Sequence, residues 1–310
     1  MTQSGLEFVE EILNIQQLTG GTSNTIYLVN INSSVKVLFR LYGVGSENFI
    51  DRNQEIENMK LLAKYNLGAP LVAEFNNGIC YHYVNGRSLS NADIFKEEIY
   101  TLVAEKLAKI HNIPMESKQN VLWSKTKNLI NLISEFENNE HYGNGIFNCK
   151  NDLVKEFHFL KSLLENCDSP IVFCHLDLNL PNILYDGTEV HFIDVEYSGC
   201  SYAAFDIANH FVEFVGFEEN ILEYERWYPD KKFQLSWLRK YFAVFTENIS
   251  EAQIESTYQL VQQFVLCSHL MWGAWSLVQS QVSKINFNFK DFAHQRFLEY
   301  ARMKNIVIKT

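Results

Sequence analysis

The stretch that decides the fold reads Phe173-Cys174-His175-Leu176-Asp177-Leu178-Asn179-Leu180-Pro181-Asn182-Ile183-Leu184-Tyr185. An apolar run enters this stretch and another leaves it, while Pro181 and the asparagines beside it disfavour a regular element in the middle. The sequence therefore predicts a loop between two buried segments, and this loop carries His175, Asp177 and Asn182. Loops that are fixed by a buried scaffold are common places for catalytic groups.

The spacing of these three residues, His-x-Asp-x-x-x-x-Asn, matches the catalytic loop of kinase-fold phosphotransferases. There the Asp accepts the proton of the attacking hydroxyl and the Asn helps to hold magnesium. A lone His–Asp pair is as readily a hydrogen-bonded loop anchor. Support comes from Val190–Glu196, because Asp194 and Glu196 are two positions apart and would share one face of an extended strand. Two carboxylates on one face suit a hard cation that also binds phosphate oxygens.

A nucleotide site is predicted upstream, in the loop Leu18–Thr25 just before the first predicted strand. Glycines let the backbone approach phosphates, and amide and hydroxyl groups bind them, although a Gly-Gly pair alone is more often a turn. The candidate residues are Gly20, Gly21, Ser23 and Asn24. Arg40 then ends a predicted strand and Glu55 opens a predicted helix. Alone they would as readily form a surface pair, but in this order they match the phosphate-gripping ion pair of kinases, with Arg in place of Lys.

The periodicity of the chain predicts two regions of different structure. Strands are expected near 26–29, 35–40, 71–72 and 80–83, with one helix that contains Ile56, Met59 and Ala63. After residue 85 the pattern is mostly helical. A helical stripe starts at Ile99, capped upstream by Asn91 or Asp93, and further helices are expected near 122–136, 150–166, 203–215, 234–249, 256–283 and 290–303. We expect an α+β fold with a small β-rich N-terminal lobe, residues 1–86, and a large, mainly α-helical C-terminal lobe, residues 87–310.

Composition excludes several classes of protein. With 26 Lys+Arg against 37 Asp+Glu, the net charge of −11 argues against a nucleic-acid binder and against an anionic membrane surface as partner. The six cysteines form no CxxC, so we expect free thiols in a reducing compartment. The segment Ser256–Ser283 has no charged residue but carries several Gln, Ser and His side chains, which predicts a helix buried in protein with no integral membrane contact. We expect a soluble, cytoplasmic protein without a secretory signal.

With these motifs the sequence resembles a known family, the choline/ethanolamine kinases, which are relatives of the aminoglycoside phosphotransferases. The resemblance covers nearly the whole chain, in segments that include Gly20–Asn24, Val37–Gly43, Phe173–Asn182, Phe192–Tyr197, Phe205–Phe211 and His269–Ser276. It implies a protein-kinase-like bilobal fold and transfer of the ATP γ-phosphate to the hydroxyl of a small amino alcohol. It assigns Asp177 as the base, with His175 beside it in the catalytic set. Asn182 and Asp194 become ligands of Mg²⁺, assisted by Glu196, while Tyr83 and Val84 join the nucleotide site.

An acceptor pocket follows from residue types that suit an ammonium group. Asp206, Asn209, His210 and Glu213 share a helix face, Trp272 and Trp275 share another, and Phe287 and Phe292 follow a turn. A substrate ammonium needs a carboxylate and aromatic ring faces, whereas a tryptophan pair on a buried helix is otherwise core packing. By the resemblance, Glu213, Trp272, Trp275 and Phe287 match the amine-binding positions. Phe292 stands where many choline kinases have Tyr. We interpret Asp206 and His210 as residues that brace the catalytic loop.

Several interpretations of the function stay open. Glu213–Gly216, Tyr224 and Tyr228-Pro229 resemble the ethanolamine-type members, so we expect phosphoethanolamine and ADP as products of a Kennedy-type phospholipid head-group pathway. Choline as main acceptor, giving phosphocholine, is the alternative. An aminoglycoside-type phosphotransferase and a catalytically inert kinase-fold binding protein stay open as well. No Asp-Phe-Gly or Ala-Pro-Glu is found for a polypeptide substrate, and the oligomeric state is open, with a homodimer as one option.

Overall fold

The structure is a computed structural model and describes residues 14–18, 24–32, 35–43, 51–116, 118–134, 141–216 and 222–308. Within the chain two compact units are distinguished, Met1–Gly86 and Arg87–Thr310, and each is described by itself. Of the predicted nucleotide-binding residues, Gly20, Gly21 and Ser23 lie outside the described residues.

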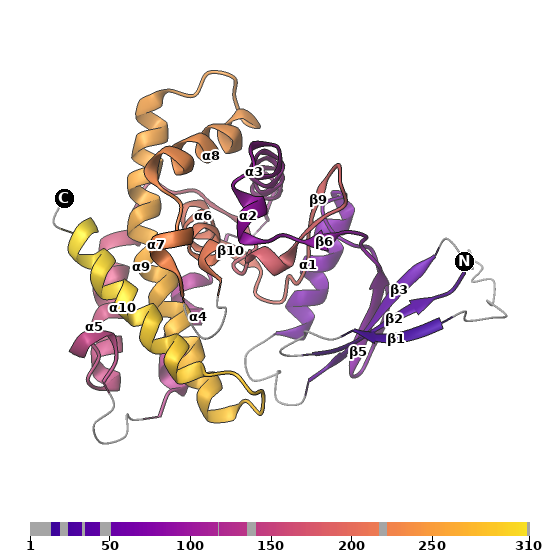
Figure 1. The fold of residues 1–310 in the computed structure, drawn as a ribbon, viewed down its shortest axis with the longest axis horizontal. Helices are drawn as coiled ribbons and strands as arrows, with labels where there is room; N and C mark the ends of the chain where they lie inside the picture. The colour runs from indigo at the N-terminus through magenta and orange to yellow at the C-terminus, as the bar shows by residue number, and fades with distance from the viewer. Residues whose placement is uncertain are drawn as a thin grey trace. The chain divides into compact units, whose positions relative to one another are not determined.

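The first unit is built on an antiparallel sheet of five strands in the order β1-β2-β3-β5-β4 (Figure 1). Its elements are β1 (Asn14–Leu18), β2 (Asn24–Asn30), β3 (Lys36–Tyr42), α1 (Arg52–Lys64), β4 (Leu71–Phe75) and β5 (Gly78–His82). The four predicted strands and the predicted helix are all present. The strand β1 was not predicted, because its sequence Asn-Ile-Gln-Gln-Leu has no alternation of apolar and polar residues and most of it is exposed.

Arg40 and Glu55 are positioned by a close strand contact and by a capped helix. In the register of β3 with β5, Arg40 lies opposite Ile79. A Cβ on the neighbouring Gly78 would lie only 2.3 Å from the carbonyl oxygen of Arg40, so glycine is required for the strands to approach. The helix α1 begins after Asp51, whose side chain accepts a hydrogen bond from Gln54 N. Its buried face carries Glu55.

The second unit is mainly helical. Its helices are α2 (Asn91–Ile94), α3 (Glu97–His111), α4 (Leu122–Leu132), α5 (Lys150–Leu164), α6 (Ala203–Val212), α7 (Tyr224–Trp227), α8 (Lys231–Ala243), α9 (Glu251–Val282) and α10 (Phe289–Val307). Short strands β6 (Arg87–Ser88), β7 (Ile171–Cys174), β8 (Ile183–Tyr185), β9 (Val190–Phe192) and β10 (Gly199–Tyr202) form two small sheets, β6-β8-β9 and β10-β7. The single-turn 3₁₀ helices are η2 (Gly143–Gly145), η3 (Leu180–Asn182) and η4 (Glu213–Val215). The predicted α+β fold class is confirmed.

The long helix α9 is the centre of this unit and packs against α6, α4 and α10; it lies beside α10 in Figure 1. Its uncharged stretch is mostly buried in protein from Val261 to Val278, and none of the described helices is long and apolar enough to cross a membrane. Close packing of α10 depends on Gly273, because a Cβ there would lie 2.4 Å from Cε1 of the fully buried Phe297.

One predicted cap was wrong. The helix α3 begins after Lys96, and Asn91 and Asp93 belong instead to the separate short helix α2. The carboxylate of Asp93 completes a capping box with Ser90 and pairs with Arg87 and Lys96, so it is not available to cap α3.

Candidate functional site

The loop that follows β7 has the predicted form, with a buried strand on either side. Asn179 caps the short helix η3, since its side-chain oxygen accepts a hydrogen bond from Asn182 N at 3.0 Å. Pro181 sits in the first turn of η3, where its missing N–H costs nothing. The local sequence thereby brings Asn182 back toward Asp177, and the Asn182 amide nitrogen donates to the Asp177 main-chain oxygen at 2.9 Å and to its carboxylate at 3.3 Å.

The residue before Asp177 has a strained backbone. Leu176 has φ +66°, a left-handed conformation that costs a leucine about 1–2 kcal/mol. Two side chains of α6 hold it there. Asp206 Oδ1 accepts a hydrogen bond from Leu176 N at 2.7 Å, and Asn209 Nδ2 donates to Leu176 O at 3.2 Å. Because Asp206 Oδ2 also accepts from His175 N at 2.8 Å, α6 sets the path of the loop into Asp177.

Asp206 is itself held by two buried residues that the sequence did not reveal. His111 Nε2 lies 3.0 Å from Asp206 Oδ2, and His111 Nδ1 lies 2.7 Å from Tyr241 Oη. Burial raises the pKa of Asp206, but the hydrogen bond and charge of His111 outweigh it and leave that pKa below its usual value. An ionised Asp206 only accepts hydrogen bonds, so His111 Nε2 is the donor of this contact.

His175 and His210 are both buried and both contact main-chain oxygens. His175 Nε2 donates to Ile193 O at 3.0 Å, while its Nδ1 accepts from Asp177 N at 3.3 Å. Burial lowers the pKa of His175. His210 Nδ1 donates to Leu178 O at 2.8 Å. These contacts agree with the interpretation that Asp206 and His210 brace the loop, and they give His175 the same kind of role, between the loop and the segment of Asp194.

Asp177 lies in a group of carboxylates. Desolvation, followed by the charges of Glu213, Asp194 and Glu196, raises the pKa of Asp177 well above its usual range. Carboxylate oxygens of Asp194 and Glu196 lie within 4.8 Å of each other, close enough to share a cation. The strand geometry predicted for them was wrong, because β9 ends at Phe192 and Asp194 has φ +63°. A left-handed turn, and not one face of a strand, brings the two side chains together.

The predicted aromatic residues form one connected set of rings. Trp272 and Trp275 lie 5.4 Å apart between ring centroids, and Phe287 lies 5.8 Å from Phe292. Two rings missed from the sequence join them. Phe289 lies 5.8 Å from Trp275 and 4.7 Å from Phe287, and Tyr197 lies 5.2 Å from Trp272 and accepts a hydrogen bond from Trp275 Nε1 at 3.0 Å. The signal for Tyr197 was its place directly after Glu196.

Glu213 lies in η4, directly after α6, and has a cationic partner. Arg296 Nη1 of α10 donates to Glu213 Oε1 at 3.1 Å. The Arg296 side chain is 1% exposed and that of Glu213 is 18% exposed, so solvent or a ligand reaches only the carboxylate. Sequence reasoning missed Arg296, because 83 residues separate the partners.

In the first unit the predicted ion pair between Arg40 and Glu55 is formed, and both side chains are buried. Arg52 was not predicted. Its Nη1 lies 2.8 Å from Glu55 Oε2, its Nη2 donates to Asn24 Oδ1 at 3.2 Å, and its guanidinium lies 4.4 Å from the centre of the Tyr42 ring. Two arginines on one carboxylate thus connect α1 with β2 and β3.

The remaining predicted residues of this unit lie after β5. Tyr83 N donates to Lys36 O at 3.1 Å, and the Lys36 ammonium lies 5.7 Å from the centre of the Tyr83 ring. This contact fastens the segment of Tyr83 and Val84 to the start of β3.

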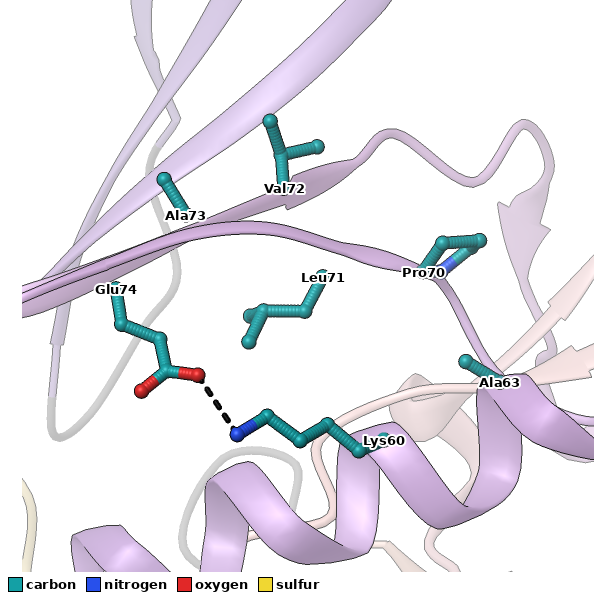
Figure 2. A pocket seen from close by; sticks show the side chains of 7 residues that line it. All are labelled: Lys60, Ala63, Pro70, Leu71, Val72, Ala73 and Glu74. Carbon is teal, nitrogen blue, oxygen red and sulfur yellow. Dashed lines mark ion pairs between the residues drawn. The ribbon is translucent and has the colours of Figure 1, made fainter. Parts of the chain in front are cut away.

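A hollow between α1 and β4 contains none of the predicted site residues. It is lined by Lys60, Ala63, Pro70, Leu71, Val72, Ala73 and Glu74 (Figure 2). Its two charged side chains, Lys60 and Glu74, pair with each other at 2.8 Å, so they neutralise the charge of the hollow. We assign it no catalytic role.

Comparison with known proteins agrees with the observed fold and with the predicted family resemblance. The family model of choline/ethanolamine kinase matches residues 15–301, and the chain therefore belongs to the choline/ethanolamine kinase family. A curated relative, ethanolamine kinase 1 of Mus musculus, is 34% identical over 309 residues, which cover 94% of this chain and 84% of the relative.

Two solved structures show how far the fold is shared. An ethanolamine kinase of Plasmodium vivax is similar with a TM-score of 0.83 and 27% identity, over 94% of this chain and 84% of that one. A spectinomycin phosphotransferase shares the fold at a TM-score of 0.55 and 12% identity, over 94% and 93% of the two chains. The predicted resemblance and the kinase-like fold are confirmed.

Proposed function

We propose that this protein is an ATP-dependent kinase that transfers the γ-phosphate to the hydroxyl of a small amino alcohol. Ethanolamine is the favoured acceptor, giving phosphoethanolamine and ADP for phospholipid head-group synthesis. The observation that carries the proposal is the family match over residues 15–301, in a chain where Asp177, Asp194 and Glu196 form one acidic group. The relatives named as ethanolamine kinases support ethanolamine as the acceptor.

In this proposal Asp177 accepts the proton of the substrate hydroxyl as the phosphoryl group is transferred. Asn182, Asp194 and Glu196 hold Mg²⁺, and all three offer the oxygen atoms that this hard cation prefers. The Asn182 amide nitrogen is engaged by Asp177, which leaves the amide oxygen for the metal. Bound Mg²⁺ would neutralise charge on the ATP phosphates. His175 supports this loop from the interior, through its hydrogen bonds with Ile193 O and Asp177 N.

The first unit supplies the ATP site. Arg40, oriented by Glu55, contacts phosphate oxygens, and Asn24 contributes from the start of β2. The remaining members of this proposed site are Gly20, Gly21, Ser23, Tyr83 and Val84. A buried carboxylate that orients a cation favours phosphate binding, because the guanidinium then has little rotamer freedom to lose.

The second unit supplies the ammonium site. Glu213 accepts a hydrogen bond from the substrate ammonium, and the rings of Trp272, Trp275, Phe287 and Phe292 provide apolar and cation–π contact. A primary ammonium such as that of ethanolamine has hydrogens for the carboxylate, whereas the quaternary group of choline has none. We also propose that the protein is cytoplasmic and forms a homodimer.

The test is a coupled assay of ADP release from Mg-ATP by the purified chain. We expect turnover with ethanolamine that exceeds turnover with choline and with kanamycin, when kcat/KM values are compared side by side. Asp177→Ala should abolish this turnover, while the matched control Asp152→Ala, which loses a carboxylate paired with Lys155 on α5, should retain it.

Each competing function has its own result in this assay. A higher kcat/KM for choline would make choline the main acceptor, and a preference for kanamycin would indicate an antibiotic phosphotransferase. Calorimetry that detects binding of a partner but no binding of Mg-ATP would indicate an inert kinase-fold binding protein and refute the proposal.

A further inference from the structure

We propose that Arg296 is a positioning residue that ties the ammonium-binding carboxylate of Glu213 to the catalytic loop. The inference rests on the proposed function and adds to it a residue that holds the acceptor group and the base in register. Its evidence is a continuous series of hydrogen bonds, from Glu213 through Arg296, Ser268 and Asn209 to Leu176, within the second unit.

The Arg296 guanidinium is buried in the interior of the second unit, and the groups that it contacts there limit its position. Besides Glu213, its Nη2 donates to Ser268 Oγ at 3.1 Å and to Ser268 O at 3.4 Å, and its centre lies 5.5 Å from the centre of the Phe292 ring. A planar guanidinium held at both terminal nitrogens, Nη1 and Nη2, has one orientation, and it imposes that orientation on one oxygen of Glu213.

The series continues from Ser268 to the loop. Ser268 Oγ donates to Asn209 Oδ1 at 2.8 Å, and the same oxygen accepts a hydrogen bond from Trp272 Nε1 at 2.8 Å. Two donors on one amide oxygen fix the side chain of Asn209, so its nitrogen is directed to Leu176 O. Leu176 has the strained backbone and precedes Asp177.

The chemistry explains why such a link would matter. In a small amino alcohol only two carbons separate the nitrogen from the hydroxyl oxygen, so the carboxylate that binds the ammonium and the base that takes the proton must keep a fixed separation. An error of about 1 Å at the reacting atoms costs on the order of 100-fold in rate. Arg296 and Asn209 hold the two groups from opposite ends of one hydrogen-bonded network, and Trp272 of the aromatic set belongs to the same network.

The experiment is a double-mutant cycle of Arg296→Met and Glu213→Gln, with KM for ethanolamine and for Mg-ATP measured separately. We expect each single variant to lower kcat/KM for ethanolamine by at least about tenfold, which corresponds to about 1.4 kcal/mol. In the double variant we expect little additional loss, because Arg296 acts through Glu213. KM for Mg-ATP should change less than about twofold. Arg296→Lys keeps the positive charge but not the planar guanidinium with its two terminal nitrogens. Its kcat/KM for ethanolamine should lie between those of Arg296→Met and the wild type.

Lys304→Met is the matched control. Lys304 also lies on α10 and forms an ion pair between helices, with Glu156 of α5 at 2.6 Å, but it has no link to the network. This variant should lose thermal stability and keep the wild-type KM for ethanolamine. Additive losses in the cycle, or equal changes in both KM values, would overturn the inference while the wild-type enzyme is active. A wild-type protein that phosphorylates no amino alcohol would instead overturn the proposed function.

A milder variant covers the case in which Arg296→Met does not fold. Ser268→Ala removes the hydroxyl between Arg296 and Asn209 but leaves the ion pair with Glu213. We expect kcat to fall at least about threefold with KM for Mg-ATP unchanged. Wild-type kcat in a folded Ser268→Ala protein would refute the link to the loop.

Discussion

Substitution of Gly273 by Ala tests how closely α10 must pack on α9. The added Cβ would lie 2.4, 2.7 and 3.0 Å from three atoms of the Phe297 ring, against about 3.5–4.0 Å for a relaxed contact between carbons. The ring would have to move by about 1 Å, and it is fully buried, with Phe147 at 4.5 Å between ring centroids. The ring has little room to relax.

The change in stability caused by Gly273→Ala is the balance of two opposing effects. Overpacking a core costs about 1–3 kcal/mol, while alanine is favoured over glycine inside a helix by about 1 kcal/mol. The cost should exceed the gain because the clash involves a ring that neighbours hold in place. We expect a net loss of about 1–2 kcal/mol, and since about 1 kcal/mol shifts Tm by about 2–4 °C in a unit of this size, a Tm lower by about 2–8 °C.

Thermal and denaturant unfolding of Gly273→Ala, Phe297→Leu and the double variant provide the assay. Leucine lacks Cε1 and Cζ, the two ring atoms nearest the added Cβ, so in the Phe297→Leu background Gly273→Ala should be neutral or stabilising. Gln259→Ala, on an exposed position of α9, is the control and should change stability by less than about 0.5 kcal/mol. A Gly273→Ala protein that is more stable than the wild type, or that loses as much stability in both backgrounds, would refute the reasoning.

Three further predictions concern buried groups. Burial lowers the pKa of His210 from 6.5 to about 4. The contribution of the neutral His210 to stability is therefore complete above pH 6.5 and is lost as the pH falls toward 4, by about 3 kcal/mol in total. Urea unfolding between pH 7 and pH 4 should show this loss of stability, and the loss should be smaller in His210→Gln. Burial raises the pKa of the Cys174 and Cys267 thiols well above 9. In the folded protein, iodoacetamide at pH 8 should therefore label the half-buried Cys149 and leave these two cysteines unmodified, as measured by mass spectrometry. Rapid labelling of Cys174 without unfolding would contradict this prediction. Asp206→Asn places a side-chain amide N–H against a main-chain N–H of the loop. We expect a stability loss of about 1–3 kcal/mol together with a large fall in kcat. A wild-type kcat in this variant would show that the loop does not depend on the Asp206 carboxylate.

The features that the sequence predicted are the local ones. Pro181 and the asparagines beside it indicated the loop, and β-branched and aromatic runs indicated the strands of the first unit. The Arg40–Glu55 pair was found because a strand cation and a helix carboxylate in that order have a known use. Local pattern gave no information on β1, whose polar sequence resembles a loop.

The features that the sequence did not predict depend on contacts between distant segments. Tyr241 reaches His111 over 130 residues, and Arg296 reaches Glu213 over 83. Neither pair has a periodicity that reveals it, because a buried polar residue on an apolar helix has the same pattern whether its partner is near or far. The turn at Asp194 was missed for a different reason, since a left-handed aspartate looks like a strand residue when it follows an apolar run.

The bracing of Leu176 has a consequence for the order in which this enzyme becomes competent during synthesis. Asp206 and Asn209, which hold Leu176, follow it by 30 and 33 residues, and Ser268, which fixes Asn209, follows that residue by another 59. The loop of Asp177 therefore leaves the ribosome well before the segments that give it its shape. Until α9 has emerged and docked, the nascent chain carries the proposed catalytic side chains but lacks the scaffold that arranges them. Premature termination after Glu196 but before Ser268 would thus leave a polypeptide with the complete motif and without the residues that fix its shape.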